Sequence, residues 1–287
     1  MREGRNEAVR LNDDDFSFIC QFVYDSTGIV LHSGKREMVY RRLARIVRER
    51  QLHSFTQYCQ LLKENPEQES GYFINAITTN LTSFFREQHH FDYLVQQEIP
   101  KLLKEQGING NKRLRIWSSA SSTGEEPYSI AITILEAMQR QIESWDVKIL
   151  ATDIDSNVLA TGKEGVYDLS RIAEVPEKTK QKYFTRGVKQ NEHKVRVADK
   201  VRRLITFKQL NLLHEWPMKG PFDVIFCRNV IIYFDKETQQ DLFARYYEML
   251  KPGGLLILGH SENLGQFSKY FTNVGRTIFR KPGGFSS

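Results

Sequence analysis

The segment FDVIFCRNVIIYFD (residues 222–235) ends an apolar run on polar side chains that could bind a ligand. The run Val224–Cys227 stops at Arg228 and Asn229, and Tyr233 follows four residues after Asn229. In an open parallel sheet, ligands bind just beyond the carboxyl ends of the strands. The segment therefore predicts the floor of an active site. The plainer interpretation is a buried strand followed by a capped loop.

The segment SSASSTGEEPYS (residues 118–129) follows an earlier apolar strand and opens a helix. Its small residues let the backbone approach a ligand closely, and the helix N-terminus offers free N–H donors. The segment lacks the GxGxxG pattern, and Glu125 and Glu126 would repel a dinucleotide phosphate. Glu126 therefore suits a cofactor with hydroxyls or a positive charge. Its alternative role is to stabilise the first turn of the helix through the helix dipole.

The segment ATDID (residues 151–155) places a carboxylate at the tip of the second predicted strand. An acidic residue there commonly accepts hydrogen bonds from ribose hydroxyls, which makes Asp153 the candidate, and Asp155 is suited to cap the next helix. Two later strands end on further candidates, which are Asn211 and Leu212 for an adenine ring, and Asn229 with Val230. Taken together, these strand ends indicate S-adenosylmethionine rather than NAD.

The elements that position these residues divide the chain into domains. Helical periodicity up to residue 85 predicts an all-helical N-terminal domain (1–85). Alternating helices and apolar strands then predict a parallel α/β domain over 86–287, with strands at Leu114–Trp117, Val147–Ala151, Ile205–Gln209, Val224–Cys227 and Leu255–Leu258. Residues 163–204 form an insertion that is long for a connection in such a domain, so it predicts a functional subdomain, with an edge ribbon around Val195–Val197.

The composition argues against a membrane-spanning, secreted or metal-binding protein. The chain of 287 residues has no apolar run near the roughly 18 residues that cross a bilayer. Its first 15 residues lack an apolar core, so we expect no secretory signal and a cytoplasmic protein that does not insert into membranes. The three cysteines show no CxxC-type spacing, and the adjacent His89 and His90 would point in different directions on a helix, so we expect no metal site.

A basic stripe on the predicted helix 35–51 indicates an acidic partner. Arg42, Arg45 and Arg48 follow one another at steps of three residues, with few acids between them, and the net charge of the chain is +6. A solvated helix face is the alternative interpretation.

Three motifs, TTNLTSFFRE (residues 78–87), ASSTGEEPYS (120–129) and FCRNVIIYFD (226–235), together closely resemble those of the CheR chemotaxis methyltransferases. These bacterial enzymes esterify glutamates on the cytoplasmic helices of chemoreceptors. The resemblance covers nearly the whole chain from about residue 12. It implies a Rossmann-like α/β methyltransferase domain that depends on S-adenosylmethionine, an N-terminal all-helical domain and a small inserted β-subdomain.

The resemblance also implies roles for particular residues. The S-adenosylmethionine site, which would release S-adenosylhomocysteine, would be lined by Asn80, Thr82, Arg86, Glu126, Asp153, Asn211, Leu212, Asn229 and Val230. Arg86 and Tyr233 would lie near the transferred methyl group, and the basic stripe would dock the methylation helix of the receptor. In some members the β-subdomain grips a pentapeptide at the receptor's C-terminus. This chain has Lys189 in place of the second glycine of the Gly-x-Gly turn associated with those members.

The implied methyl transfer requires few catalytic groups from the protein. An unperturbed glutamate side chain has a pKa of about 4.3, so it is ionised near neutral pH and needs no general base. Catalysis should come mainly from alignment and exclusion of water. We expect Arg86 to position cofactor or substrate and Tyr233 to hydrogen-bond one carboxylate oxygen. The alternatives are a structural ion pair for Arg86 and a core tyrosine for Tyr233.

Two other functions fit parts of the sequence. The basic charge suggests a nucleic-acid methyltransferase. However, Asn229 is followed directly by Val-Ile-Ile-Tyr and not by the Pro-Pro-aromatic segment that base-modifying amino methyltransferases often carry. The two basic stretches, 35–50 and 163–208, also lack the exposed interleaved aromatic residues of a single-strand binder, so we expect no nucleic-acid partner. A non-catalytic module that senses S-adenosylmethionine is disfavoured by the presence of both Arg86 and Tyr233. We expect a monomer that is recruited to membrane-bound receptors.

Overall fold

A computed structural model describes residues 10–283, which divide into two compact units. The smaller unit comprises the chain up to Thr79 together with Tyr233–Asp235, and the larger unit comprises Asn80–Ile232 and the chain from Lys236 onward. The sequence places this boundary after residue 85. Residues 1–9, which make up most of the segment used to predict the absence of a secretory signal, lie outside the described residues. Within residues 10–283, no helix is long and apolar enough to span a membrane.

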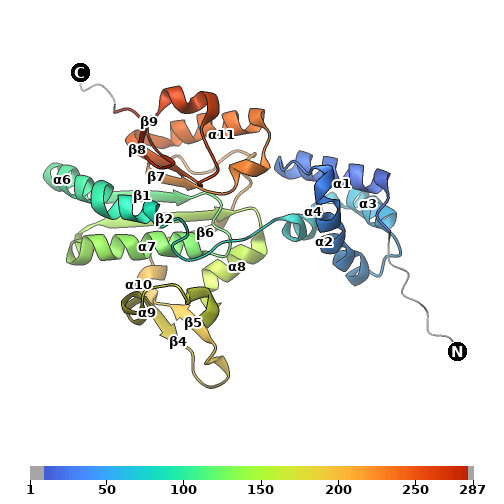
Figure 1. Ribbon diagram of the computed structural model, residues 1–287, viewed down its shortest axis with the longest axis horizontal. Helices are drawn as coiled ribbons and strands as arrows, with labels where there is room; N and C mark the ends of the chain where they lie inside the picture. Colours follow the sequence, from blue (N-terminus) through green and yellow to red (C-terminus); the bar gives the residue numbers. More distant parts are fainter. Residues whose placement is uncertain (1–9, 284–287) are drawn as a thin grey trace. The chain divides into compact units, whose positions relative to one another are not determined.

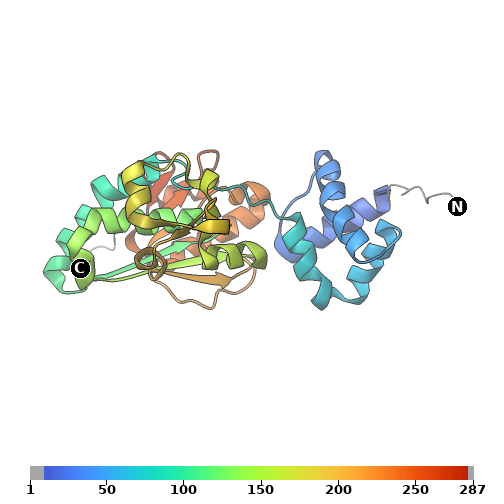
Figure 2. The same ribbon diagram turned by 90° about the horizontal axis from the view of Figure 1, so that it is seen from below.

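The smaller unit is helical, as its periodicity predicts (Figure 2). Its helices are α1 (Asp13–Thr27), α2 (Arg36–Glu49), α3 (Phe55–Glu64) and α4 (Pro66–Ile77). The ends follow the local sequence: the Ser54 side chain accepts from the N–H of Gln57 at the start of α3, and Gly28 ends α1 in the left-handed conformation. The four helices enclose an apolar core whose fully buried members include Leu43, Phe55 and Phe73.

The larger unit is built on a sheet that, in the described residues, has seven strands in the order β6-β2-β1-β7-β8-β10-β9. The strands are β1 (Arg113–Ser118), β2 (Asp146–Asp153), β6 (Ile205–Gln209), β7 (Phe222–Cys227), β8 (Leu250–Leu258), β9 (Thr272–Gly275) and β10 (Ile278–Arg280). The strands β6, β2, β1, β7 and β8 run parallel to one another, and β10 and β9 complete the sheet as antiparallel strands. The order reverses direction between β1 and β7, which is where an open α/β sheet binds its ligands.

Helices cover both faces of this sheet. The main ones are α5 (His89–Tyr93), α6 (Ile99–Asn109), α7 (Glu125–Met138), α8 (Ser156–Glu164) and α11 (Lys236–Met249). Figure 1 shows α7 and α11 on opposite sides of the sheet. All residues of β7 are buried, as expected for a central parallel strand covered on both faces. The apolar run of the opening segment is therefore a core strand, and Arg228 is the first residue after it.

The insertion forms a small antiparallel sheet with two short helices. Its strands are β3 (Val166–Asp168), β4 (Phe184–Arg186) and β5 (Lys194–Val197), and its helices are α9 (Glu177–Tyr183) and α10 (Asp199–Arg202). The strand order is β3-β5-β4, so β5 is the central strand and the predicted edge ribbon at Val195–Val197 is wrong in this respect. The reason is that β3, which immediately follows α8, pairs with the second edge of the β5 backbone.

Candidate cofactor and active site

The loop between β1 and α7 is built from small residues that its neighbours hold in place. The N–H of Ser121 donates to the carbonyl of Thr152 at 2.8 Å, while the Ser121 hydroxyl is buried and has no hydrogen-bond partner among residues 10–283. Gly124 has a φ of +99°, and a Cβ at this position would lie 2.9 Å from the Cα of Gly162. The entry into α7 therefore requires glycine, both for its φ and for the close approach of the two backbones.

Asp153 lies at the carboxyl end of β2, and backbone N–H groups hold its side chain. Its Oδ2 accepts from the N–H of Ser122 at 2.8 Å, and its Oδ1 accepts from the N–H of Asp155 at 3.0 Å. Burial raises the pKa of Asp153 to about 6, although these N–H groups oppose the shift. Asp155 accepts from the N–H groups of Asn157 and Val158, which confirms that it caps α8.

Asn80 and Thr82 are joined to neighbouring segments of the larger unit by direct hydrogen bonds. The Asn80 amide donates to Oδ2 of Asp155 at 2.7 Å, and its carbonyl accepts from the hydroxyl of Ser122 at 3.0 Å. The Thr82 carbonyl accepts from Arg171 at 2.9 Å. The segment that carries the first predicted cofactor residues is thus tied to the loop that follows β1 and to the loop that follows β2.

Arg228, to which the sequence assigns no role, lies at the centre of a buried charge cluster. Its Nη1 donates to Oε2 of Glu126 at 2.9 Å, and its Nη2 lies 3.4 Å from Oε2 of Glu87. The same Nη2 donates to the carbonyl of Arg86. The other oxygen of Glu126 accepts from the hydroxyl of Ser118 at 2.7 Å. Although burial raises the pKa of Glu126, Arg228 supplies the positive charge that opposes this shift.

Glu87 completes this cluster and holds a negative charge in it. Its Oε1 accepts from Nδ1 of His260 at 2.9 Å and lies 3.5 Å from the amide of Asn229. Burial alone would raise the pKa of Glu87, but the hydrogen bond from His260 and the charge of Arg228 hold it at about 2. The carboxylate is therefore ionised at any pH near neutral.

Glu262 fixes the backbone of the Asn229–Ile231 turn. Its carboxylate accepts from the N–H groups of Asn229, Val230 and Ile231, each at 2.9 Å, and from the N–H of Gly259 at 2.7 Å. The turn needs this support because Asn229 has a φ of +57°. Sequence reasoning misses both Glu262 and His260. The polar residues that follow Leu258, the end of β8, are the signal that could have identified them, by the same rule that selects Asp153.

Asn211 and Leu212 lie just beyond β6, and their polar groups already close local turns. Oδ1 of Asn211 accepts from the N–H of Leu213 at 3.0 Å, and the Leu212 carbonyl accepts from the indole N–H of Trp216 at 3.1 Å. The Leu212 side chain is buried. The carbonyl of Asp153 accepts from the N–H of Leu210 at 2.9 Å, so this segment begins beside the end of β2.

The nine predicted cofactor residues, Arg86 among them, all belong to the larger unit. The Arg86 guanidinium donates to the carbonyl of Leu81 at 2.9 Å and, within residues 10–283, makes no ion pair. Tyr233 belongs to the smaller unit, where its carbonyl accepts from the N–H of Val30 at 2.8 Å. The roles of Arg86 and Tyr233 near a transferred methyl group stay predictions.

The basic stripe of α2 separates into two kinds of arginine. Arg42 is half-buried and donates to the carbonyls of Ile77 and Thr78, the latter at 2.8 Å, so it caps the C-terminus of α4. Arg45 and Arg48 are exposed. Arg45 pairs with Glu49 at 2.6 Å, an exposed i,i+4 contact that leaves the charge accessible to water. A docking role therefore fits Arg45 and Arg48 better than Arg42.

Glu87, His89 and His90 bring three possible metal-ligand atoms within 4.8 Å of one another, and they are the candidate metal group among residues 10–283. The two imidazole rings lie 4.0 Å apart, so the expectation that adjacency separates them is wrong: His89 is the first residue of a short helix rather than part of a long one. Nε2 of His90 contacts Thr277 Oγ1 at 2.9 Å. Because the positively charged guanidinium of Arg228 lies 3.4 Å from the Glu87 carboxylate and would repel a metal cation, we assign no ion to this group.

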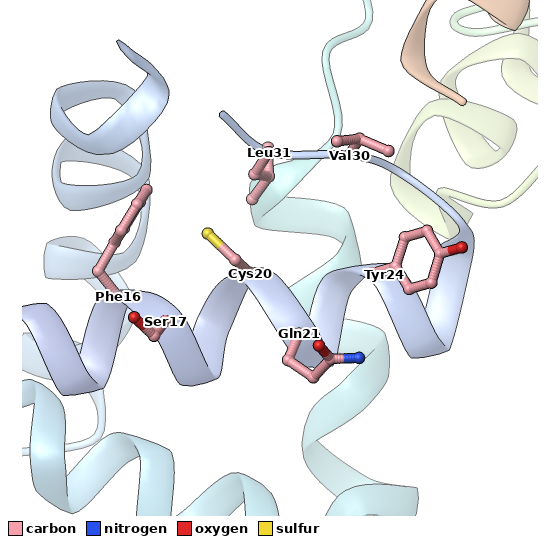
Figure 3. A pocket seen from close by; sticks show the side chains of 7 residues that line it. All are labelled: Phe16, Ser17, Cys20, Gln21, Tyr24, Val30 and Leu31. Atoms are coloured by element: carbon pink, nitrogen blue, oxygen red, sulfur yellow. The ribbon is translucent and has the colours of Figure 1, made fainter. Parts of the chain in front are cut away.

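A separate groove lies on the smaller unit. It has a volume of about 330 Å³ and is lined by one face of α1 and by the segment Val30–Leu31 (Figure 3). The lining side chains are Phe16, Ser17, Cys20, Gln21, Tyr24, Val30 and Leu31. None of the predicted cofactor residues lines this groove, so it is distinct from the cofactor site.

Comparison with known proteins gives a consistent result for both units. The family model "CheR methyltransferase, all-alpha domain" matches residues 14–78, and "CheR methyltransferase, SAM binding domain" matches residues 80–280. The chain is 44% identical over 277 residues to chemotaxis protein methyltransferase 2 of Pseudomonas aeruginosa, which covers 96% of this chain and 95% of that protein. It is 43% identical to the chemotaxis protein methyltransferases of Salmonella typhimurium and Escherichia coli, in each case covering 95% of this chain and 92% of the relative.

Proposed function

This chain belongs to the CheR methyltransferase family, and on that premise we propose that it transfers a methyl group from S-adenosylmethionine to glutamate side chains of chemoreceptors. The reaction would take place in the cytoplasm, on the cytoplasmic helices of receptors that are themselves membrane-bound. The observation that carries the proposal is the convergence of polar groups from four segments at one edge of the parallel sheet. These segments are 80–87, the β1–α7 loop, the end of β2 and the turn after β7.

The residues at this edge fit S-adenosylmethionine in their donor and acceptor types. Asp153 offers a carboxylate at the strand end that suits ribose hydroxyls, and Ser121 has a buried hydroxyl without a partner in the part of the chain that the structure describes. Asn211 offers an amide beside the buried Leu212, which suits an adenine ring. We infer that Asn80, Thr82, Arg86, Glu126, Asn229 and Val230 complete the site. Glu126 would contribute through its carboxylate, whose negative charge is partly compensated by the guanidinium of Arg228.

The bound cofactor would supply a methyl group on a positively charged sulfur, which a carboxylate can attack directly. The protein has to align that carboxylate and exclude water, because the glutamate substrate is already ionised near neutral pH. We infer that Tyr233 donates a hydrogen bond to one carboxylate oxygen and leaves the other free. Arg86 would orient cofactor or substrate. A bidentate clamp on the nucleophile would stabilise the ground state more than the transition state, so we do not assign one to Arg86.

The exposed face of α2 is proposed to dock the acidic methylation helix of the receptor through Arg45 and Arg48. Arg42 would support this face by holding the end of α4. The inserted β-subdomain is a second candidate contact, for a pentapeptide at the receptor's C-terminus. Lys189 adopts a φ of +54° in this turn, and a Cβ on Gly187 would meet the carbonyl oxygen of Asn191 at 2.1 Å. The tight turn is thus retained, with a lysine in a conformation that favours glycine.

The proposal is tested by incubating the protein with methyl-labelled S-adenosylmethionine and receptor-containing membranes. Label that is fixed to the receptor and released by mild base as a methyl ester supports the proposal. Absence of label from receptors that a known relative methylates under the same conditions contradicts it. Receptors with and without their C-terminal tails separate the two docking surfaces: equal rates on both substrates would exclude the pentapeptide as a required contact.

A further inference from the structure

Arg228 is a buried cation that joins three segments of the larger unit. Only 2% of its side chain is exposed, and its guanidinium contacts Glu126 of α7, Glu87 of the 80–87 segment and the carbonyl of Arg86. It also lies over the ring of Phe91, with 5.9 Å from its Cζ to the ring centroid. A planar guanidinium can contact two carboxylates and a carbonyl at once, whereas a lysine ammonium of similar length is a single point of charge.

The backbone that Arg228 contacts adopts an unusual conformation. Phe85 has a φ of +54° and Glu87 a φ of +59°, so left-handed residues that are not glycine flank Arg86 on both sides. Such conformations persist only when surrounding contacts determine them, and they cluster at functional sites. The contacts are present: the N–H of Phe85 donates to the hydroxyl of Ser129 at 2.8 Å, and the carbonyl of Arg86 accepts from Arg228.

We propose that Arg228 is a positioning residue for the methyl-transfer site: its guanidinium holds the carboxylate of Glu126 and the strained Arg86 turn in the geometry that binds S-adenosylmethionine. This inference rests on the proposed function. It assigns Arg228 no contact with the reacting atoms, because its three polar partners are all protein groups. The turn carries the Arg86 guanidinium, so loss of Arg228 changes the direction of that side chain as well as the charge near Glu126.

A purely structural ion pair is the competing explanation, and the larger unit contains a matched example. Arg280 donates to Oε2 of the buried Glu98 at 2.6 Å and to the hydroxyl of Tyr93 at 3.0 Å. None of these three residues is a predicted site residue. Replacement of Arg280, whose side chain is 18% exposed, therefore measures what the loss of an arginine paired with a buried glutamate does to folding alone.

The experiment compares Arg228→Lys and Arg228→Gln with Arg280→Gln by calorimetric titration of S-adenosylmethionine and by thermal unfolding. We expect Arg228→Lys to weaken cofactor binding about tenfold or more, the usual effect of losing hydrogen bonds to charged groups. Arg280→Gln should lower the Tm but keep the Kd within about twofold of wild type. If Arg228→Gln fails to fold, the lysine variant alone decides. A lysine variant that binds the cofactor within about twofold of wild type overturns the proposal.

A double-mutant cycle measures the coupling between two losses in cofactor affinity, which a purely structural role of Arg228 would not produce. Because Arg228 acts through Glu126, the losses in cofactor affinity from Arg228→Lys and Glu126→Gln should be strongly non-additive. Those from Arg280→Gln and Glu126→Gln should simply add. Additive losses in both cycles would contradict the positioning role. These titrations need no receptor, so a wild-type protein that binds the cofactor but methylates no receptor would sink the proposed function and still leave the role of Arg228 measurable.

Discussion

Nη1 of Arg228 and Oε2 of Glu126 lie 2.9 Å apart, although the two residues are separated by 102 positions in the chain. This contact joins the end of β7 to the first turn of α7. Each residue has a simpler local explanation, since Glu126 suits the helix dipole and Arg228 merely follows a strand. Together they form a buried pair, in which removal of Arg228 leaves the carboxylate of Glu126 without a compensating charge.

Cofactor binding should strengthen as the pH rises through about 6, because burial raises the pKa of Asp153 to that value. Only the ionised carboxylate accepts hydrogen bonds from both ribose hydroxyls, so the Kd for S-adenosylmethionine should fall by up to about tenfold per pH unit below this point. Calorimetric titration at several pH values measures the effect. Asp153→Asn is the control and should bind more weakly, without the pH dependence. A wild-type Kd that stays constant between about pH 5 and 8 would rule out this role.

Glu87→Gln should destabilise the larger unit by about 3 kcal/mol near neutral pH, because the pKa of Glu87 is held at about 2 in the folded protein. A depressed pKa stabilises the protein above the unfolded value of about 4.3, and this stabilisation is lost as the pH falls towards 2. The difference from wild type should therefore shrink below about pH 4. Urea unfolding near pH 7 and pH 3 measures it. Glu177→Gln, which changes an exposed carboxylate, should have little effect at either pH.

The double variant Arg45→Ala/Arg48→Ala should raise the KM for the receptor about tenfold and leave the Kd for S-adenosylmethionine unchanged. Both side chains are exposed on α2, so their loss removes positive charge without opening the core. The effect on KM should diminish at high salt, which screens exposed charges. Arg41→Ala, which removes another exposed arginine of the same helix, is the control. Loss of cofactor binding in the double variant would contradict a docking role.

Arg42→Ala should act on stability rather than on recognition alone. Its guanidinium donates to the carbonyl of Thr78 at 2.8 Å and to the hydroxyl of Thr79 at 3.1 Å, so the variant leaves the end of α4 without its cap. The smaller unit should lose about 1–3 kcal/mol. Chemical unfolding followed by circular dichroism measures the loss, because the smaller unit is helical. A stability equal to that of Arg45→Ala would show that the cap contributes nothing.

Tyr233→Phe should lower kcat for methyl transfer roughly ten- to hundredfold while the Kd for S-adenosylmethionine stays within about twofold of wild type. The substitution removes only the hydroxyl proposed to align the carboxylate, so fold and cofactor site remain. Arg86→Ala should also lose rate, with a loss in cofactor affinity that Tyr233→Phe does not share. Tyr72→Phe is the control, because Tyr72 is 59% exposed. Full activity in both site variants would end the assignment of Arg86 and Tyr233 to the active site.

Features that depend on neighbouring residues could be predicted from the amino-acid sequence. Apolar runs predicted the core strands, and the rule that ligands bind at strand ends selected Asp153 and Asn229. The caps at Ser54 and Asp155 were readable because a capping side chain bonds to N–H groups two or three residues away. The three motifs indicated the family, and the family models matched both units.

Contacts between segments that are distant in the chain became visible only in the folded protein. Periodicity cannot show that Arg228 lies between the carboxylates of Glu126 and Glu87, that Glu262 holds the turn at Asn229, or that Arg42 donates to the end of α4. A local sequence pattern does not show strand order either, so it predicts an edge position for β5, which the structure places at the centre of its sheet. Burial favours these contacts, because a charge or N–H group removed from water costs free energy unless the fold brings it a partner.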